Sequence, residues 1–454
     1  MKKIIPVLFI YLIIVSLSSC VRKEKVEVDL LLLNATIVDV LNNQLVFDQF
    51  IAIEDNTIFS VGPMNKKPDY DFKESLDLQG KYTMPGLWDN HVHFRGGTDL
   101  IAENQDLLGL FPKFGVTTVR DAGGDVTPAV MGWNEKINNG ELVGPYIFTS
   151  GPKLDGPKPA WAGSITIENE ENIEKALDSL QSINVDYVKI YDGSLSKENF
   201  YSIIEATEKR GMKVTGHMPM SADFKKAVSL GMDGSEHMYY VMKACSPKAD
   251  SLTELGLGYG MMETITDTYD EQTARELFTE LAQKEVYITP TLYIGKVLSQ
   301  LADEDHSSDS LLNRIGVGIQ ETYAGRIESA KKAKVSGSQM REKVSTLAKE
   351  MIRPMFDAEV PILAGSDCGP FNSFVYPGEA LWGELFSLTE AGLSPAEALK
   401  TSMIYGPAFF GMEDEYGSLE KGKVADIIIL KENPLKDIKN LRSLERVILK
   451  GQLN

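Results

Sequence analysis

The chain has 454 residues, and its 46 Lys and Arg against 65 Asp and Glu give a formal net charge of −19. This acidic balance argues against a nucleic-acid partner, because such binding rests on basic side chains that face phosphates. Three Cys exclude a disulfide scaffold. The 43% hydrophobic and 24% charged residues are typical of a globular protein, which at this length holds one large domain and an accessory one.

Residues 1–19 have the pattern of a signal peptide. Two lysines precede the apolar run Ile4 to Leu17, which is shorter than the ~20 residues that span a bilayer core. The run ends in Leu17-Ser-Ser-Cys20, which resembles a bacterial lipobox and predicts cleavage before Cys20 and lipidation of its thiol. A plain secretory signal and an uncleaved anchor are the alternatives. Val21, where an inner-membrane retention signal has Asp, favours a lipid-anchored protein of the bacterial cell envelope, at the outer membrane and facing the periplasm.

Short alternating β-strands are expected at both ends of the remaining chain. Residues 20–80 hold candidate strands at 30–38, 49–53 and 57–61, and residues 413–454 hold candidates at 425–430 and 447–450. Neither end has enough strands for a core of its own. We therefore expect both segments to build one small β-sandwich domain.

Residues 81–412 alternate short apolar strands with stretches of helical period, such as Lys197–Lys209 and Asp223–Leu230. Eight strand–helix units predict an α/β fold, a (β/α)8 barrel of the TIM type. A doubly wound open sheet is the alternative, but its Gly-rich fingerprint is missing. Residues 295–359 form a mostly helical insertion before the last strand. The candidate strands are Thr83–Trp88, Thr117–Arg120, Tyr146–Thr149, Tyr187–Tyr191, Val214–Gly216, Gly234–His237, Tyr287–Pro290 and Ile362–Gly365.

Polar side chains close several of these strands, and the carboxyl ends of barrel strands are where active sites lie. Four of the five His residues fall at such ends, together with one Lys and one Asp. His is the commonest ligand of zinc-like ions. The fifth, His306, lies in an acidic loop and is expected at the surface. The six candidates for a metal site are His91, His93, Lys189, His217, His237 and Asp367.

Seven motifs in this order resemble the amidohydrolase superfamily of metal-dependent barrels, and most closely its prolidase-like and imidazolonepropionase-like branch. They are Pro85-Gly-Leu-Trp-Asp-Asn-His-Val-His, Thr117-Thr-Val-Arg-Asp-Ala-Gly-Gly, Val188-Lys-Ile-Tyr, Gly216-His, Glu236-His, Thr289-Pro-Thr-Leu and Ala364-Gly-Ser-Asp. The resemblance covers nearly all of the chain after the signal peptide. It implies hydrolysis of an amide bond, in substrates such as dipeptides or cyclic amides.

The resemblance also implies two divalent ions, of the zinc type. His91, His93 and Asp367 would hold the more buried ion, His217 and His237 the more exposed one, and a carboxylated Lys189 would bridge them. Two nearby dications would strip the proton from the Lys189 ammonium, and the neutral amine can become a carbamate. The alternative is an ordinary ion pair of Lys189 with Asp186 or Asp192. Asp367 would act as general base towards a metal-activated water and then as general acid towards the leaving amine.

Four further residues are candidates for substrate binding: Arg120, Tyr191, Tyr239 and Tyr293. Arg120 could bind a substrate carboxylate, although a structural ion pair explains it equally well. The tyrosines could donate to a substrate carbonyl, or could simply pack. Cys245 and Cys368 could pair, but free thiols are favoured.

The sequence therefore predicts a lipid-anchored metal hydrolase acting on a small-molecule amide, with membrane contact through its anchor and with oligomers possible. A lactone, a phosphoester or ring deamination are alternatives on the same barrel, and Lys189 counts against deamination. A catalytically inactive ligand-binding lipoprotein is the alternative of another class, which the intact set of six residues argues against.

Overall fold

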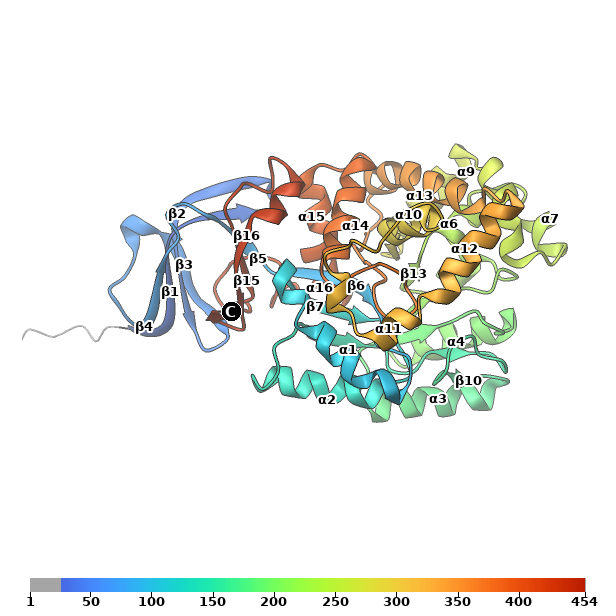
Figure 1. Cartoon of the computed structure of the whole chain (residues 1–454), viewed down its shortest axis with the longest axis horizontal. Coiled ribbons are helices and arrows are strands. Elements are labelled where there is room, and N and C mark those ends of the chain that lie inside the picture. Colours follow the sequence, from blue (N-terminus) through green and yellow to red (C-terminus); the bar gives the residue numbers. More distant parts are fainter. Residues whose placement is uncertain (1–25, 454) are drawn as a thin grey trace, which may run out of the picture.

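The computed structural model describes residues 26–453, so the predicted signal peptide and Cys20 lie outside the described residues. Within that range no helix combines the length and apolarity that crossing a membrane requires. The chain forms a β-sheet domain at one end of the molecule and a larger barrel at the other (Figure 1).

Strands from both ends of the chain build one eight-stranded sheet in the order β17-β16-β15-β5-β1-β2-β3, with β4 paired to β1. Both ends of the chain therefore contribute strands to this sheet, while the predicted β-sandwich stays a prediction. The strands are hydrogen-bonded into a single sheet, and its curl brings residues of β1, β2, β15 and β16 into one buried cluster. The strands are β1 (Val26–Asp39), β2 (Gln44–Glu54), β3 (Thr57–Pro63), β4 (Tyr70–Asp77), β5 (Tyr82–Pro85), β15 (Ile427–Leu430), β16 (Leu444–Leu449) and β17 (Gln452–Leu453).

The predicted strand Thr83–Trp88 is in fact two strands of different sheets. Its first half, β5, pairs with β15 of the terminal sheet, and its second half begins the barrel. Gly86 separates them, and its N–H donates to the Asp426 carbonyl. The boundary between the two domains therefore lies at Gly86, and not at residue 81.

The barrel contains seven parallel strands at the predicted places and an eighth segment that is almost without regular pairing. The predicted strand Ile362–Gly365 forms only an isolated bridge from Ile362 to Ile288 of β14. It still closes the ring, because Leu363 N–H donates to the Ile288 carbonyl and Asn90 N–H donates to the Ala364 carbonyl, each at 2.9 Å. The strands are β6 (Leu87–Val92), β7 (Val116–Asp121), β8 (Tyr146–Thr149), β11 (Val188–Ile190), β12 (Val214–Gly216), β13 (Gly234–Glu236) and β14 (Tyr287–Thr289); two short strands, β9 (Leu154–Asp155) and β10 (Ile165–Thr166), extend the sheet beside β11.

Helices surround the barrel, and their ends follow local sequence signals. The helix predicted at Lys197–Lys209 has these bounds in the structure, and Ser196 caps it. Ser394 and Glu397 form the predicted capping box. The helices are α1 (Ile101–Leu108), α2 (Thr127–Asn138), α3 (Glu170–Ser182), α4 (Lys197–Lys209), α5 (Phe224–Ser229), α6 (Tyr239–Ala244), α7 (Ala249–Glu254), α8 (Met262–Asp267), α9 (Glu271–Gln283), α10 (Leu292–Gln300), α11 (Val317–Glu321), α12 (Ala324–Ser336), α13 (Met340–Asp357), α14 (Glu379–Glu390), α15 (Pro395–Met403) and α16 (Tyr405–Phe409).

The insertion at 295–359 is helical, as predicted, and packs on the loop that follows Asp367. His306 belongs to this contact and is not a surface residue: only 13% of its side chain is exposed. Its ring stacks on Phe374 with centroids 4.0 Å apart, and its Nδ1 lies 2.9 Å from Asp309. The acidic sequence around His306 indicated a surface loop. It gave no sign of the aromatic contact with Phe374, which lies almost seventy positions away.

Candidate metal centre

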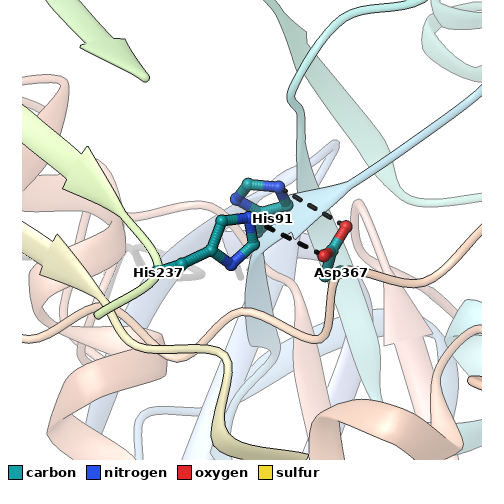
Figure 2. A group of neighbouring side chains, drawn as sticks. All are labelled: His91, His237 and Asp367. Carbon is teal, nitrogen blue, oxygen red and sulfur yellow. Dashed lines mark ion pairs between the residues drawn. The ribbon is translucent and has the colours of Figure 1, made fainter. Parts of the chain in front are cut away.

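Three side chains from opposite sides of the barrel meet at its centre: His91 from β6, His237 after β13, and Asp367 from the eighth segment (Figure 2). Their ligand atoms lie within 4.8 Å of one another. His91 Nε2 is 3.6 Å from Asp367 Oδ1, and His237 Nε2 is 3.9 Å from Asp367 Oδ2. These residue types at this spacing can hold a divalent cation.

His93 joins the same group, since its Nε2 lies 3.2 Å from Asp367 Oδ1 and 3.3 Å from His91 Nε2. Its Nδ1 faces the Gly123 carbonyl at 3.2 Å, which can only accept. The Nδ1 of His91 faces Glu236 at 2.5 Å. Burial lowers the pKa of both rings, so each neutral ring donates from Nδ1 and turns the lone pair of Nε2 towards the other.

Two lone pairs facing each other at this distance repel unless a cation lies between them. Zinc bound at 2.0–2.1 Å in a tetrahedral site sets neighbouring ligand atoms about 3.3 Å apart, which is close to the separations of His91, His93 and Asp367. The residues present therefore fit a divalent ion at this point.

His217 and His237 lie side by side with ring centroids 4.9 Å apart. Each presents Nδ1 to an oxygen outside the cluster, with 3.2 Å from His217 to Asp192 and 2.7 Å from His237 to Thr291. Gly216, at φ +152°, precedes His217, and a side chain there would collide with the Ile190 carbonyl. Metal-binding His residues are usually oriented by such partners, which leave Nε2 for the ion.

Lys189 is fully buried, and its Nζ makes no hydrogen bond within the described residues. Glu236 Oε1 lies 3.6 Å from it, whereas neither Asp186 nor Asp192 is its partner. Asp186 bonds the Thr149 N–H, and Asp192 faces His217. Burial lowers the pKa of Lys189 to about 8. The effect of burial is larger than that of the Glu236 charge, which raises the pKa. A buried amine without a hydrogen bond and with a lowered pKa fits a site of carboxylation.

Asp367 is held by the loop that follows it. Asn372 Nδ2 donates to Asp367 Oδ1 at 2.7 Å and also to the Asp367 carbonyl. Arg326 of the insertion donates to Asn372 Oδ1 at 2.6 Å. Burial alone would raise the pKa of Asp367, but its contacts with His93, His91 and His237 hold it well below its usual range. The carboxylate is therefore ionised and fixed in place.

Three residues of the cluster have left-handed backbone conformations that side chains rarely adopt: His237 at φ 63°, Thr291 at φ 50° and Asp367 at φ 54°. Each such position costs about 1–3 kcal/mol and persists only where the surroundings impose it. Their concentration around one point marks it as the functional centre of the barrel.

A family model described as "Amidohydrolase family" matches residues 82–453. The chain belongs to the amidohydrolase family. It is 23% identical over 414 residues to an ochratoxinase of Aspergillus niger, which covers 78% of this chain and 71% of the relative. An imidazolonepropionase of Thermoplasma volcanium is 26% identical over 104 residues, which cover 22% of this chain and 25% of the relative. A crystal structure of a Xaa-Pro dipeptidase with bound methionine superposes with a TM-score of 0.69 at 19% identity, over 94% of this chain and 99% of that one.

The family match confirms the predicted amidohydrolase, and the superposition confirms the predicted fold class. The metal-binding fold is that of a hydrolase, with its six candidate residues gathered as described above.

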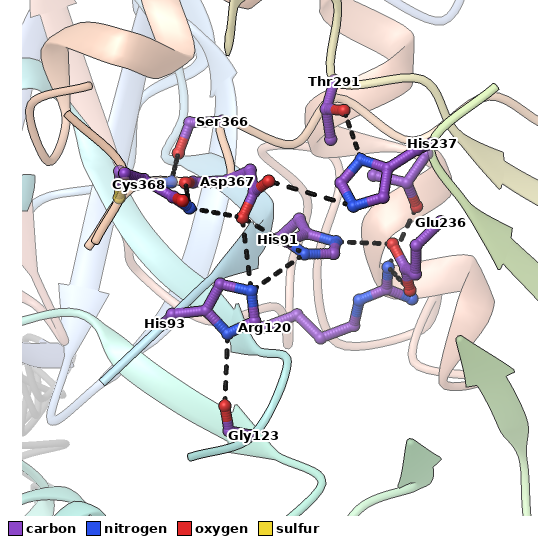
Figure 3. Close-up of polar contacts among 12 residues, drawn as sticks. His91, His93, Arg120, Gly123, Glu236, His237, Thr291, Ser366, Asp367 and Cys368 are labelled. Atoms are coloured by element: carbon purple, nitrogen blue, oxygen red, sulfur yellow. Dashed lines mark hydrogen bonds and ion pairs between the residues drawn. The ribbon is translucent and has the colours of Figure 1, made fainter. Parts of the chain in front are cut away.

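Sequence reasoning gave no role to Glu236, which lies between His91 and Arg120 (Figure 3). Its Oε2 accepts from His91 Nδ1 at 2.5 Å, and its Oε1 accepts from Arg120 at 2.9 Å and from the Thr215 hydroxyl at 2.9 Å. Burial alone would raise the pKa of Glu236, but Arg120, Lys189 and His91 hold it well below its usual range. The available signal was an acid inside a short predicted strand, directly before His237.

The predicted role of Arg120 in substrate binding does not fit its position. Only 1% of Arg120 is exposed, and its guanidinium donates to Glu236, to the Asn90 carbonyl at 2.6 Å and to Thr289 at 3.0 Å. These contacts hold its Nε and Nη2 inside the barrel, while its buried Nη1 has no hydrogen-bond partner among the described residues. The alternative named in the sequence analysis, a structural ion pair, is what the structure shows: Arg120 pairs with Glu236.

Removing Arg120 is expected to destabilise this amidohydrolase strongly. In Arg120→Met the buried Glu236 carboxylate loses its main counter-ion, which costs about 3–5 kcal/mol in the free energy of unfolding. Urea denaturation followed by circular dichroism measures the change. Arg210→Met is the matched control, because Arg210 pairs with two mostly exposed acids and such pairs contribute about 1 kcal/mol or less. Equal stability of both variants would contradict the prediction.

The three candidate tyrosines have different surroundings. Tyr191 stacks on His217 with centroids 4.2 Å apart, and Tyr239 lies 6.3 Å from the His237 ring. Both can therefore line the space beside the His residues. Tyr293 instead lines a separate cavity of about 520 Å³ with His306 and Tyr376, so its predicted contact with substrate does not fit its position. Thr291, with its left-handed backbone, directly precedes α10, the helix that carries Tyr293.

The two cysteines of the described residues that follow the barrel strands, Cys245 and Cys368, are both buried and free. The favoured prediction of free thiols is therefore confirmed. Burial raises the pKa of the Cys245 thiol to about 12, which keeps it protonated and unreactive.

Proposed function

We propose that this amidohydrolase cleaves an amide bond of a small molecule at a site for two divalent ions of the zinc type. The observation that carries the proposal is the convergence of His91, His93 and Asp367 beside the pair His217 and His237. His91, His93 and Asp367 would hold one ion, and His217 and His237 the other. Bound there, the ions would supply Lewis acidity, which lowers the pKa of water and polarises a carbonyl group.

Lys189 would bridge the two ions as a carbamate. The ammonium would first lose one proton; its neutral amine would then attack carbon dioxide, an N–C bond would form, and a second proton would leave to solvent, which yields an anion with two oxygens. The lack of a hydrogen bond at Lys189 Nζ supports this step, since the carbamate would gain partners that the amine lacks.

Asp367 would move the proton. As an ionised carboxylate it can accept a proton from the attacking water and then deliver it to the departing nitrogen. Amines leave poorly without a proton, so this delivery matters more for an amide than for an ester. Asn372 would hold the carboxylate in the orientation that both transfers need.

The names of the relatives support an amide substrate: a Xaa-Pro dipeptidase and an ochratoxinase are among them. Screening zinc-loaded protein against dipeptides, N-acyl amino acids, cyclic amides and lactones tests the proposal. Turnover of amides and none of lactones is expected. Turnover of lactones alone would overturn the amide assignment, and zinc uptake without turnover of any class would favour the ligand-binding alternative.

We further propose that the chain is lipid-anchored through Cys20 at the outer membrane, facing the periplasm, as the lipobox-like pattern at residues 17–20 indicates. Wild-type protein expressed in bacteria is expected to enter the detergent phase on Triton X-114 partition. Cys20→Ser is expected to stay in the aqueous phase. Equal partition of both would contradict lipidation at Cys20.

A further inference from the structure

We propose that Tyr259 is a positioning residue for His217, and that it acts through Asp192 from a glycine-hinged segment that docks onto the site. The segment is Leu255-Gly-Leu-Gly-Tyr-Gly, residues 255–260, between α7 and α8. The inference rests on the proposed role of His217 as a metal ligand.

Asp192 links the two residues. Its Oδ1 lies 3.2 Å from His217 Nδ1, and its Oδ2 accepts from the Tyr259 hydroxyl at 2.6 Å. The single proton of Tyr259 goes to Asp192, so the 2.6 Å contact between the Tyr240 and Tyr259 hydroxyls has Tyr240 as the donor. Two hydroxyls in series thus fix the carboxylate that orients the His217 ring. Burial raises the pKa of Tyr259, which keeps its hydroxyl protonated as this role requires.

The segment that carries Tyr259 is otherwise weakly attached. Leu255 is 68% exposed, Leu257 47% and Tyr259 37%. A Cβ added at Gly256, Gly258 or Gly260 would meet nothing within 4 Å, so no close packing explains these glycines. Gly256 and Gly258 have φ of +66° and +53°, which favours glycine at both positions.

Backbone hydrogen bonds do not tie the segment to the barrel either. Gly256 N–H donates to Thr253 and Gly260 N–H donates to Leu257, both close in sequence. The Tyr259 hydroxyl, together with the edge contact of its ring to Tyr239 at 5.3 Å, therefore provides its attachment beside the site. Few buried contacts and a glycine-rich backbone are the features of a segment that opens locally at low cost. Docking and the orientation of His217 are coupled because they share one hydrogen bond.

Zinc titration of metal-free protein against a chromophoric chelator tests the coupling without a substrate. Tyr259→Phe keeps the ring and removes the hydroxyl. We expect the weaker of two zinc-binding steps to lose about tenfold in affinity, as is usual when the partner of a metal-binding His is removed, while the tighter step is unchanged. Asp192→Asn is expected to give at least the same loss, and the double variant no more than Asp192→Asn alone, because Tyr259 acts only through Asp192.

Hydrogen exchange followed by mass spectrometry provides the second readout. In Tyr259→Phe the amides of 255–260 are expected to exchange about tenfold faster, with the melting temperature of the chain unchanged. Tyr269→Phe is the control, since Tyr269 is a half-buried tyrosine that packs against the barrel core. Unchanged zinc affinity in Tyr259→Phe, or additive losses in the double variant, would overturn the proposal. If the wild-type protein took up no zinc, the proposed function itself would be wrong. If, in addition, hydrogen exchange at 255–260 were unchanged in Tyr259→Phe, the proposed docking of the segment would be wrong as well.

Discussion

Asp367→Asn is expected to lower kcat for an amide substrate by about a thousandfold or more while the fold stays intact. Proton transfer by a positioned side chain contributes about 10²–10⁴-fold, and an Asn amide can neither take a proton from water nor return it to nitrogen. The substitution also removes the negative oxygen that faces His91 and His93 at 3.6 and 3.2 Å. Steady-state kinetics on the best amide of the screen measures the loss, and circular dichroism checks the fold.

Asp309→Asn provides the control for this change. Asp309 is also a partly buried acid beside an imidazole, since it accepts from His306 and from the Tyr376 hydroxyl, but it lies in the contact of the insertion. We expect kcat of Asp309→Asn within about threefold of wild type. If Asp367→Asn hydrolysed the amide at a wild-type rate, Asp367 would lose its place in the proton path.

The gathering of the six candidates could be predicted because the barrel itself converts strand order into proximity. His91, Lys189, His217 and Asp367 are up to 276 positions apart, yet every strand of a closed parallel ring ends at the same rim. Recognising each strand was therefore enough to bring its last polar residue to the site. The prediction survived even where the eighth strand has almost no regular pairing, since single hydrogen bonds to β6 and β14 hold it in place.

The partners of those residues could not be predicted, because they depend on side-chain direction and on loops. Glu236 and His237 are neighbours, but one faces Arg120, 116 positions away, and the other faces Thr291. Asp192 follows a strand and was considered only as a partner of Lys189, whereas it turns to His217. Tyr293 follows the left-handed backbone of Thr291, a conformation that no propensity indicates for a β-branched residue.

The split of Thr83–Trp88 between two sheets shows a related limit. The run is buried and mostly apolar, and periodicity alone cannot tell where one sheet ends and another begins. Gly86 gave the only local signal. The partner of the first half, β15, lies more than 340 positions later, so the assignment depends on a contact that the sequence of the run does not encode.

Lys189→Ala is expected to abolish turnover and to reduce bound zinc from about two ions per chain to one or fewer. The change removes the group that would supply one carbamate oxygen to each ion, and it leaves a cavity beside the intact pair of Glu236 and Arg120. Short carboxylates such as propionate fit such a cavity and carry the missing oxygens. We therefore expect millimolar propionate to restore part of the zinc content and of the activity of Lys189→Ala. In Lys189→Arg, whose side chain cannot be carboxylated, propionate should restore neither the zinc content nor the activity. Elemental analysis and kinetics measure both effects.

The same chemistry gives a direct signature in the unaltered enzyme. Protein assembled with zinc and ¹³C-labelled bicarbonate should show a carbamate carbon in its NMR spectrum, and protein assembled without carbon dioxide should bind less zinc. Lys243→Met is the matched control, because Lys243 is a buried lysine that donates to two backbone carbonyls, at 2.6 and 2.8 Å, and so has no comparable need of carboxylation. It should keep the labelled signal and about two ions. A wild-type spectrum without the signal, together with full zinc content, would mean that the amine of Lys189 stays free and that another group bridges the ions.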